Sequence, residues 1–336
     1  MDLVELAGRH LVARRRVAAA AVLGAVREWR TLDSRDLTGS WAQLAPRLLA
    51  VVSAGQTASA ASAQAYTERS AALQGARPEP AGAVVAQAFA GYASDGRDLA
   101  SLLYLPVIDS KEAIASGAST SEAMAVGERK LRMLVDTEVA DAGRAADGVG
   151  ITADRALSGY VRMISGGACG RCAVLAGVRY AYNKGFQRHP HCHCTHVPVA
   201  GRGRHRPKVP TLNPRVYFDS LTAAQQNRAF TVHGAQAIRD GADIRQVVNA
   251  RRGVATTGSW VENGVTHRGR LARTGTGQQV TTTSFGTSRR SLAGRRLREA
   301  GARGQQVRRL TPEAIYRLAS TRDEAIQLLY RHGYIV

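Results

Sequence analysis

One short window of the sequence contains every thiol in the chain. The segment ACGRCAVLAGVRYAYNKGFQRHPHCHCTHVP, residues 168–198, holds all four cysteines and four of the nine histidines of a 336-residue protein. Cys169 and Cys172 are separated by two residues, a spacing that lets two thiolates reach one tetrahedral ion. Cys192 and Cys194 come much later and are separated by one residue. The window therefore predicts a fold in which two turns, distant along the chain, meet around one metal ion.

Five side chains are candidates for the four positions of such a site. The simplest set is the four cysteines, whereas a rival set keeps Cys169 and Cys172 and adds His189 with either Cys192 or Cys194. Three further histidines are interleaved with the second pair of cysteines. Because side chains alternate between the two faces of an extended chain, we place these histidines around the site or in solvent: His191, His193 and His196.

Zinc suits these ligands best. Thiolate and imidazole in a tetrahedron describe a closed structural site, and residues 166–210 contain no aspartate or glutamate that could act as a base. The N-terminus has no apolar block of the signal-peptide kind, so we expect folding in a cytoplasm, where disulfides are rare. Two disulfides, or thiols without a metal, are the alternatives. A window of about thirty residues has almost no core, and structural zinc can supply on the order of 10 kcal/mol of folding free energy.

The basic residues are concentrated in the second half of the chain. Residues 1–150 carry 16 Lys and Arg against 17 Asp and Glu, whereas residues 151–336 carry 30 against 9. This excess predicts an anionic partner, with nucleic acid as the first candidate and an acidic protein surface as the second. Few aromatic residues lie between the cations, so we expect little sequence preference. The candidate DNA contacts are Arg202, Arg204, Arg206, Lys208, Arg251, Arg252, Arg289, Arg290, Arg295 and Arg296.

The first half has the pattern of long helices. Apolar residues recur at three-to-four spacing over residues 3–29, and a second helix is predicted from a cap at Ser34. Small residues in SAGQTASAASAQAY would let a neighbouring helix approach closely. Further helices are predicted over 83–103, ended by Pro106, over 110–146, ended by DGVG, and over 152–165, capped by Thr152.

Less regular structure is predicted in the rest of the chain. Two short strands are expected over residues 173–186, then an extended tail through Pro198, a helical piece over 222–240, and a long loop or disordered arm over 255–290. Thr311 followed by Pro312, and Thr321 with Glu324 three residues later, predict two terminal helices, the second ended by Gly333.

Together these elements predict a mainly α fold with an elongated helical first half, a small zinc-knuckle α+β module, and a basic, partly irregular C-terminal region that ends in short helices. The predicted domains are residues 1–150, 151–200, 201–310 and 311–336.

The cysteine window resembles the signature of Mu F-like minor head proteins of tailed phages. In that family a C-x2-C pair leads through a glycine-containing hairpin to a His-Pro-x-Cys-x-Cys close. The matching positions are Cys169, Cys172, Gly177, His189, Pro190, Cys192 and Cys194. The segments LTPEAIYRLASTRDEAIQLLYRHGYI and QVVNARRG also resemble proteins encoded beside the portal gene in phages of actinobacteria.

The resemblance implies a head morphogenesis protein that associates with the portal and with the major capsid or scaffolding protein. Such a protein is assembled in the host cytoplasm, enclosed in the head of the virion, and meets double-stranded DNA there. Some proteins of this gene position are called capsid maturation proteases, so an enzyme is the alternative. The sequence argues against it, because no His-Glu-x-x-His occurs and the candidate serines lie in no nucleophile motif. These serines are Ser165, Ser220 and Ser259.

Overall fold

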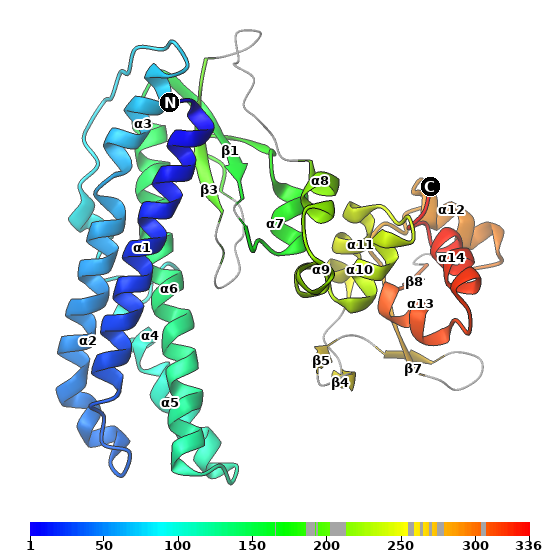
Figure 1. Cartoon of the computed structure of the whole chain (residues 1–336), viewed down its shortest axis with the longest axis horizontal. Helices are drawn as coiled ribbons and strands as arrows, with labels where there is room; N and C mark the ends of the chain where they lie inside the picture. Colours follow the sequence, from blue (N-terminus) through cyan, green and yellow to red (C-terminus); the bar gives the residue numbers. More distant parts are fainter. Residues whose placement is uncertain are drawn as a thin grey trace. The chain divides into compact units, whose positions relative to one another are not determined.

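The computed structural model describes most of the chain as two compact units (Figure 1). The described residues are 1–164, 166–185, 192, 194–201, 213–254, 259–262, 265–268, 271–273, 279–303 and 307–336. Unit 1 comprises Met1–Ser165 and Gly177–Thr211, and unit 2 comprises Gly166–Ala176 and Leu212–Val336. Each unit therefore contains two separate stretches of the sequence. The division into four domains predicted above stays a prediction.

Unit 1 is built on long helices. Figure 1 shows α1, α2 and α6 running alongside one another, and these three helices, together with α5, make the most extensive helix–helix contacts of the unit. The helices of this unit are α1 (Leu3–Trp29), α2 (Leu37–Ala60), α3 (Ala63–Ala72), η1 (Ala86–Phe89), α4 (Leu99–Leu103), α5 (Leu105–Ala115) and α6 (Thr120–Ala153). A capping box at Ser119 and Glu122 starts α6. The mainly helical fold expected from the sequence is confirmed.

Small residues let the three long helices pack closely, as the sequence predicts. A Cβ atom on Gly55 of α2 would lie 2.9 Å from the Cβ of Ala21 in α1 and 3.0 Å from a methyl of Val139 in α6. No larger side chain fits between these helices. Around this contact the core is aliphatic, with Leu48 and Val52 fully buried.

A small antiparallel sheet completes unit 1. Its strands are β1 (Leu157–Met163), β2 (Arg179–Ala181) and β3 (Thr195–Ala200), in the order β2-β1-β3. Val161 of β1 pairs with Val197 of β3, and both pack against Leu6 of α1 and Tyr66 of α3. The Tyr66 hydroxyl donates to the backbone carbonyl of His196 at 2.7 Å. The sheet is thus attached to the helices by both apolar and polar contacts.

Several predicted helix boundaries in unit 1 are wrong. The helix expected over 152–165 is the end of α6 followed by strand β1, in which residues 157, 159, 160, 161 and 162 are buried. DGVG lies inside α6, where Gly150 packs against Thr67 at a distance that excludes a Cβ atom. Between residues 83 and 103 only η1 and α4 are helical, and Pro106 lies in the first turn of α5 instead of ending a helix. Tertiary packing overrides the local helical pattern at these places.

Unit 2 consists of short helices and small antiparallel sheets. Its helices are α7 (Gly170–Leu175), α8 (Pro214–Asp219), α9 (Ala223–Phe230), α10 (Val232–Arg239), α11 (Ile244–Ala250), η3 (Arg251–Gly253), α12 (Leu292–Glu299), α13 (Pro312–Leu318) and α14 (Arg322–Arg331). Its strands are β4 (Ser259–Glu262), β5 (Val265–Arg268), β6 (Leu271–Arg273), β7 (Gln279–Thr283) and β8 (Arg309–Leu310), paired as β4-β5 and β6-β7-β8. Phe230, Ile238, Ile315 and Leu329 are buried in its core.

The terminal helices of unit 2 begin and end as predicted. The Thr311 and Thr321 side chains cap α13 and α14, and Gly333 follows α14 with a positive φ of 69°. By contrast, the long loop expected over 255–290 is wrong for the described residues, which include β4 to β7. The two strands expected over 173–186 are wrong in part, because α7 occupies the first portion and only β2 is a strand. Within the described chain, no helix combines the length and apolar character needed to cross a bilayer.

Candidate metal centre

Cys192 and Cys194 are held in place where the chain enters β3. The guanidinium of Arg144, from α6, donates two hydrogen bonds to the carbonyl oxygen of Cys192, at 3.1 and 2.7 Å. Arg144 is itself buried and paired with Asp141, whose carboxylate lies 3.2 Å from its Nε. Both cysteine side chains are buried, and their Sγ atoms are 2.8 Å apart. The two thiols of the C-x-C pair thus lie next to one another.

Cys169 and Cys172 lie at the start of α7. Cys169 is the N-cap residue, and its Sγ accepts a hydrogen bond from the backbone N–H of Cys172 at 3.4 Å. The hydroxyl of Tyr217 donates to the carbonyl of Ala168 at 2.8 Å and so holds the turn before this helix. Burial raises the pKa of Tyr217, and the nearby sulfurs of Cys169 and Cys172 raise it further. Cys172 is buried, whereas Cys169 is half-buried.

Three of the four thiols form one group. The Sγ atoms of Cys172, Cys192 and Cys194 all lie within 4.8 Å of one another, and all three residues are buried. Around a tetrahedral zinc ion with Zn–S bonds of about 2.3 Å, thiolate sulfurs lie about 3.8 Å apart. The limit of 4.8 Å on the sulfur separations in this group includes that value, so the three sulfurs are near enough to be ligands of one ion. Three buried cysteines that could bind a metal are therefore present.

A buried cation lies beside this group. Nη2 of Arg162, from β1, is 3.7 Å from the Sγ of Cys192, and the Arg162 side chain is 1% exposed. A guanidinium next to a thiol favours its ionised form, which is the form that binds metals. Sequence reasoning missed both Arg162 and Arg144, because neither stands in a recognisable spacing relative to the cysteines.

The structure accounts separately for Cys169 and for the four histidines of the cysteine window. Cys169 is not a member of the three-sulfur group. His189, His191 and His193 lie outside the described residues. His196 does not face solvent, because it is 3% exposed in β3 and its ring lies 4.2 Å from that of Tyr160. The choice of a fourth ligand between Cys169 and His189 stays open.

The predicted DNA contacts within the described chain all belong to unit 2. Five are exposed: Arg251, Arg252, Arg289, Arg290 and Arg295. Arg296 instead donates to the carbonyls of Tyr330 and Ile335 at 2.8 and 2.7 Å, and its guanidinium lies 3.5 Å from the centre of the Tyr330 ring. Arg202, Arg204, Arg206 and Lys208 lie outside the described residues.

A buried polar cluster in unit 1 was not expected from the sequence. Asp147 of α6 accepts hydrogen bonds from Arg14, one of them 2.9 Å long, and its Oδ1 lies 3.2 Å from Nε2 of His10. Nδ1 of His10 is 3.5 Å from the hydroxyl of Ser62, and Tyr66 stacks on the imidazole at 3.7 Å. Although this is an ordered Ser, His and Asp series, Arg14 neutralises the carboxylate and Tyr66 covers the base. We interpret the cluster as a structural link between α1, α3 and α6.

These features define a mainly helical protein with a buried cysteine cluster in its middle region. A comparison with protein-family models shows the family to which the chain belongs. Residues 5–224 match the VG15 protein family model, so the chain belongs to the VG15 protein family, a family of viral (phage) gene products. Neither the search of curated proteins nor the search of solved structures found a match.

Proposed function

We propose that this protein is a minor head protein of a tailed phage, which acts in head morphogenesis, associates with the portal and contacts packaged DNA without sequence preference. The observation that carries the proposal is the buried cysteine group within a chain of a phage family. The basic second half supports the DNA contact. The resemblance of residues 168–198 to the Mu F-like signature supports the place in the head.

In this proposal the cysteine group holds a structural zinc ion. Cys172, Cys192 and Cys194 would be three ligands, and Cys169 or His189 the fourth. When bound, zinc would supply folding free energy to a segment that has little apolar core. Arg144 positions the second pair through the Cys192 carbonyl, and Arg162 compensates the negative charge of the thiolates.

The metal content of the reduced, full-length protein tests this part of the proposal. We expect about one zinc per chain, and its loss in Cys172→Ser, Cys192→Ser and Cys194→Ser proteins. Loss in only one of Cys169→Ser and His189→Ala identifies the fourth ligand. His233→Ala, which changes a histidine of α10, should keep its zinc. A wild-type protein without zinc would refute the proposed site.

Exposed arginines supply the proposed DNA affinity. A protein that releases counterions from DNA loses affinity linearly on a logarithmic salt scale, with a slope of about −0.9 per phosphate neutralised. We expect Arg251→Gln/Arg252→Gln to reduce this slope by about one to two, measured by anisotropy on two unrelated duplexes. Arg15→Gln/Arg16→Gln removes a pair of arginines that is also exposed, in α1, and should leave the slope unchanged. Equal effects of both pairs would contradict a DNA-binding role for unit 2.

Association with the head is tested by infection with a phage that lacks this gene. Tagged protein supplied in trans should co-purify with portal and capsid proteins from procapsids treated with nuclease. Retention that disappears with nuclease would mean that DNA alone holds the protein.

The alternative, a capsid maturation protease, has weaker support. The window of residues 166–210 contains no carboxylate, and Ser220 donates its hydroxyl to the Tyr217 carbonyl at 2.7 Å. The same deletion phage tests it: capsid protein left uncleaved, and rescued by wild type but not by a Ser62→Ala or Ser220→Ala protein, would favour the protease.

A further inference from the structure

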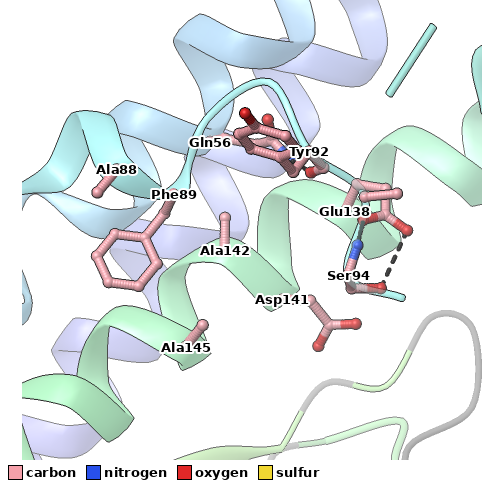
Figure 2. Close-up of a pocket in the computed structure, with 10 residues that line it drawn as sticks. Gln56, Ala88, Phe89, Tyr92, Ser94, Glu138, Asp141, Ala142 and Ala145 are labelled. Carbon is pink, nitrogen blue, oxygen red and sulfur yellow. Dashed lines mark hydrogen bonds between the residues drawn. The ribbon is translucent and has the colours of Figure 1, made fainter. Parts of the chain in front are cut away.

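Charged side chains in this protein differ in whether neighbouring groups compensate them. Unit 1 contains a cavity of about 480 Å³ that Glu138, Asp141 and Tyr92 help to line (Figure 2). Glu138 accepts two hydrogen bonds from Ser94, and Asp141 is paired with Arg144. Both carboxylates of this cavity therefore have partners within unit 1.

The arginines around α12 and at the end of α14 have no such partners. Four of them are exposed: Arg289, Arg290, Arg295 and Arg331. Within the part of the chain that the structure describes, none of the four forms an ion pair with a carboxylate. Helix α12 itself contains three arginines and one acid, Glu299. This part of unit 2 therefore presents uncompensated positive charge to the solvent.

Packing brings these arginines onto neighbouring segments. Helix α12 lies beside α14 (Figure 1), and a Cβ atom on Gly333, just after α14, would lie 2.7 Å from the Cα of Ala293. The backbone of Ser288 packs against Gly294 at a distance that also excludes a Cβ atom. Residues 288–296 and 330–333 thus lie together, and we call their exposed part the α12–α14 surface. Its members are Arg289, Arg290, Arg295, Arg296, Tyr330 and Arg331.

An exposed aromatic ring belongs to the α12–α14 surface. The guanidinium of Arg296 lies 3.5 Å from the centre of the Tyr330 ring, and hydrogen bonds to the carbonyls of Tyr330 and Ile335 hold it there. Arg296 covers one face of the ring, yet Tyr330 is 52% exposed. A ring that is supported on one face and open on the other needs little ordering when a planar ligand stacks on it.

The combination of free arginines and an open ring selects the kind of ligand. Arginine neutralises phosphates, and an aromatic ring stacks on any base, because every base has a π-face. Inside a duplex the base pairs are already stacked on one another, so Tyr330 reaches a base face only where strands are open or end. An acidic peptide would contact the arginines but would leave the ring without a planar partner.

We propose that the α12–α14 surface binds single-stranded DNA, with one base stacked on the face of Tyr330 opposite Arg296. The phosphates on either side of this base contact the exposed arginines, which are Arg289, Arg290, Arg295 and Arg331. This inference rests on the DNA contact proposed above and adds a preference for DNA whose bases are accessible. It implies no preference for sequence, since stacking tolerates every base.

Fluorescence anisotropy with the full-length protein tests the proposal. The probe is a thymidine strand of about twelve nucleotides, and its control is an abasic strand of the same length, which keeps the phosphates and lacks the bases. We expect the abasic strand to bind about tenfold more weakly, because the stacked base is lost. Equal binding of the two strands would overturn the proposal, as would polyglutamate that competes as well as unlabelled thymidine strand.

Protein variants locate the stacking. Tyr330→Ala should weaken binding of the thymidine strand by about tenfold, whereas Tyr330→Phe keeps the ring and should bind as wild type does. Tyr92→Ala removes an exposed tyrosine of unit 1 and should also bind as wild type does. Unchanged binding by Tyr330→Ala overturns the proposal. If that variant fails to fold, the abasic comparison decides, because it uses the wild-type protein.

A duplex separates this inference from the DNA contact on which it rests. Tyr330→Ala should bind a duplex of about forty base pairs within about twofold of wild type, because phosphate contacts dominate there. An equal loss for duplex and single strand would overturn the preference for accessible bases and leave the DNA contact standing. Wild-type protein that binds neither probe would overturn both.

Discussion

At the scale of single residues, the charge of the buried Asp147 carboxylate is compensated by its neighbours. Burial alone would raise the pKa of Asp147, but the charge of Arg14 and the hydrogen bond from His10 outweigh it and lower the pKa to about 2. For His10, burial is the main cause of a lowered pKa, so the neutral imidazole is favoured. The cluster is stable because each buried polar group finds a partner.

Removal of the buried carboxylate should therefore be costly. In Asp147→Asn, Arg14 would stay buried without its counter-charge, and we expect a loss of about 3–5 kcal/mol in the free energy of unfolding. Urea denaturation measures this loss. Asp95→Asn breaks an exposed pair with Arg97 and should have a much smaller effect. Similar losses in the two variants would contradict a structural role for the cluster.

His332 should make the stability of unit 2 depend on pH. Burial, together with the charges of Arg331 and Arg309, lowers its pKa from 6.5 to about 4, and its Nδ1 accepts a hydrogen bond from the N–H of Leu310. Because the folded-state pKa is depressed, the unfolded chain takes up the proton first as the pH falls. The stabilisation is complete above pH 6.5 and is lost towards pH 4, by about 3 kcal/mol.

In the variant His332→Gln, the free energy of unfolding should depend less on pH between pH 6.5 and pH 4. Denaturation at neutral pH and near pH 4, for wild type and variant, isolates the contribution of this one residue. If the free energy of unfolding of the wild type depended on pH no more steeply than that of the variant, His332 would not be the cause of the pH dependence.

At the scale of elements, helix α6 shows that tertiary packing can require a glycine where helix propensity alone would favour another residue. A Cβ atom on Gly127 would lie 2.5 Å from the ring of Trp29 and 2.8 Å from the carbonyl oxygen of Pro106, whereas a Cβ atom on Gly148 would meet nothing within 4 Å. Both glycines are inside the same helix. Local propensity treats them alike, and only the neighbours distinguish them.

The two glycines provide a matched pair of substitutions. Gly148→Ala should raise the free energy of unfolding by up to about 1 kcal/mol, the gain in helix propensity. Gly127→Ala should lower it by about 1–3 kcal/mol, because the added methyl overpacks the contact with Trp29. Thermal or urea unfolding measures the change in the free energy of unfolding for each variant. Stabilisation by Gly127→Ala would show that α5 and α6 separate easily.

At the scale of the whole molecule, the two units are interleaved along the chain. Residues 166–176 belong to unit 2 although unit 1 both precedes and follows them. Several contacts attach α7 to later elements of unit 2. Arg171 donates to the side chain of Asn249 at 2.6 Å, and Gly170 lies so close to Phe230 that a Cβ atom would be 2.8 Å from its ring.

A chain shortened to residues 1–211 should therefore lose structure at a defined place. Without α9 and α11, the amides of residues 166–176 should exchange with solvent much faster, since their tertiary contacts are gone. The amides of α1, α2 and α6 should keep their protection. Hydrogen exchange with mass spectrometry measures both segments, and unchanged protection of α7 would mean that its own hydrogen bonds suffice.

Much of the fold followed from local signals. The helical first half, the close packing of small residues in α2, and the caps Thr311 and Thr321 depend on side chains three to four residues apart, so a single sequence contains them. The C-x2-C and C-x-C spacings identified the cysteines in the same way. The helix expected over 152–165 failed because β1 is decided by its pairing with β3, about forty residues away in sequence.

The amino-acid sequence by itself determined which residues favour helix, where several helices begin and end, which thiols are available, and where the positive charge is concentrated. Only the tertiary structure decided that Cys172, Cys192 and Cys194 meet, that Arg144 and Arg162 support them, and that Glu138 and Tyr92 share a cavity. The reason is physical: caps and helical periodicity are satisfied within one or two turns. A shared ligand site or a buried ion pair instead requires atoms from segments that only packing of the core brings together.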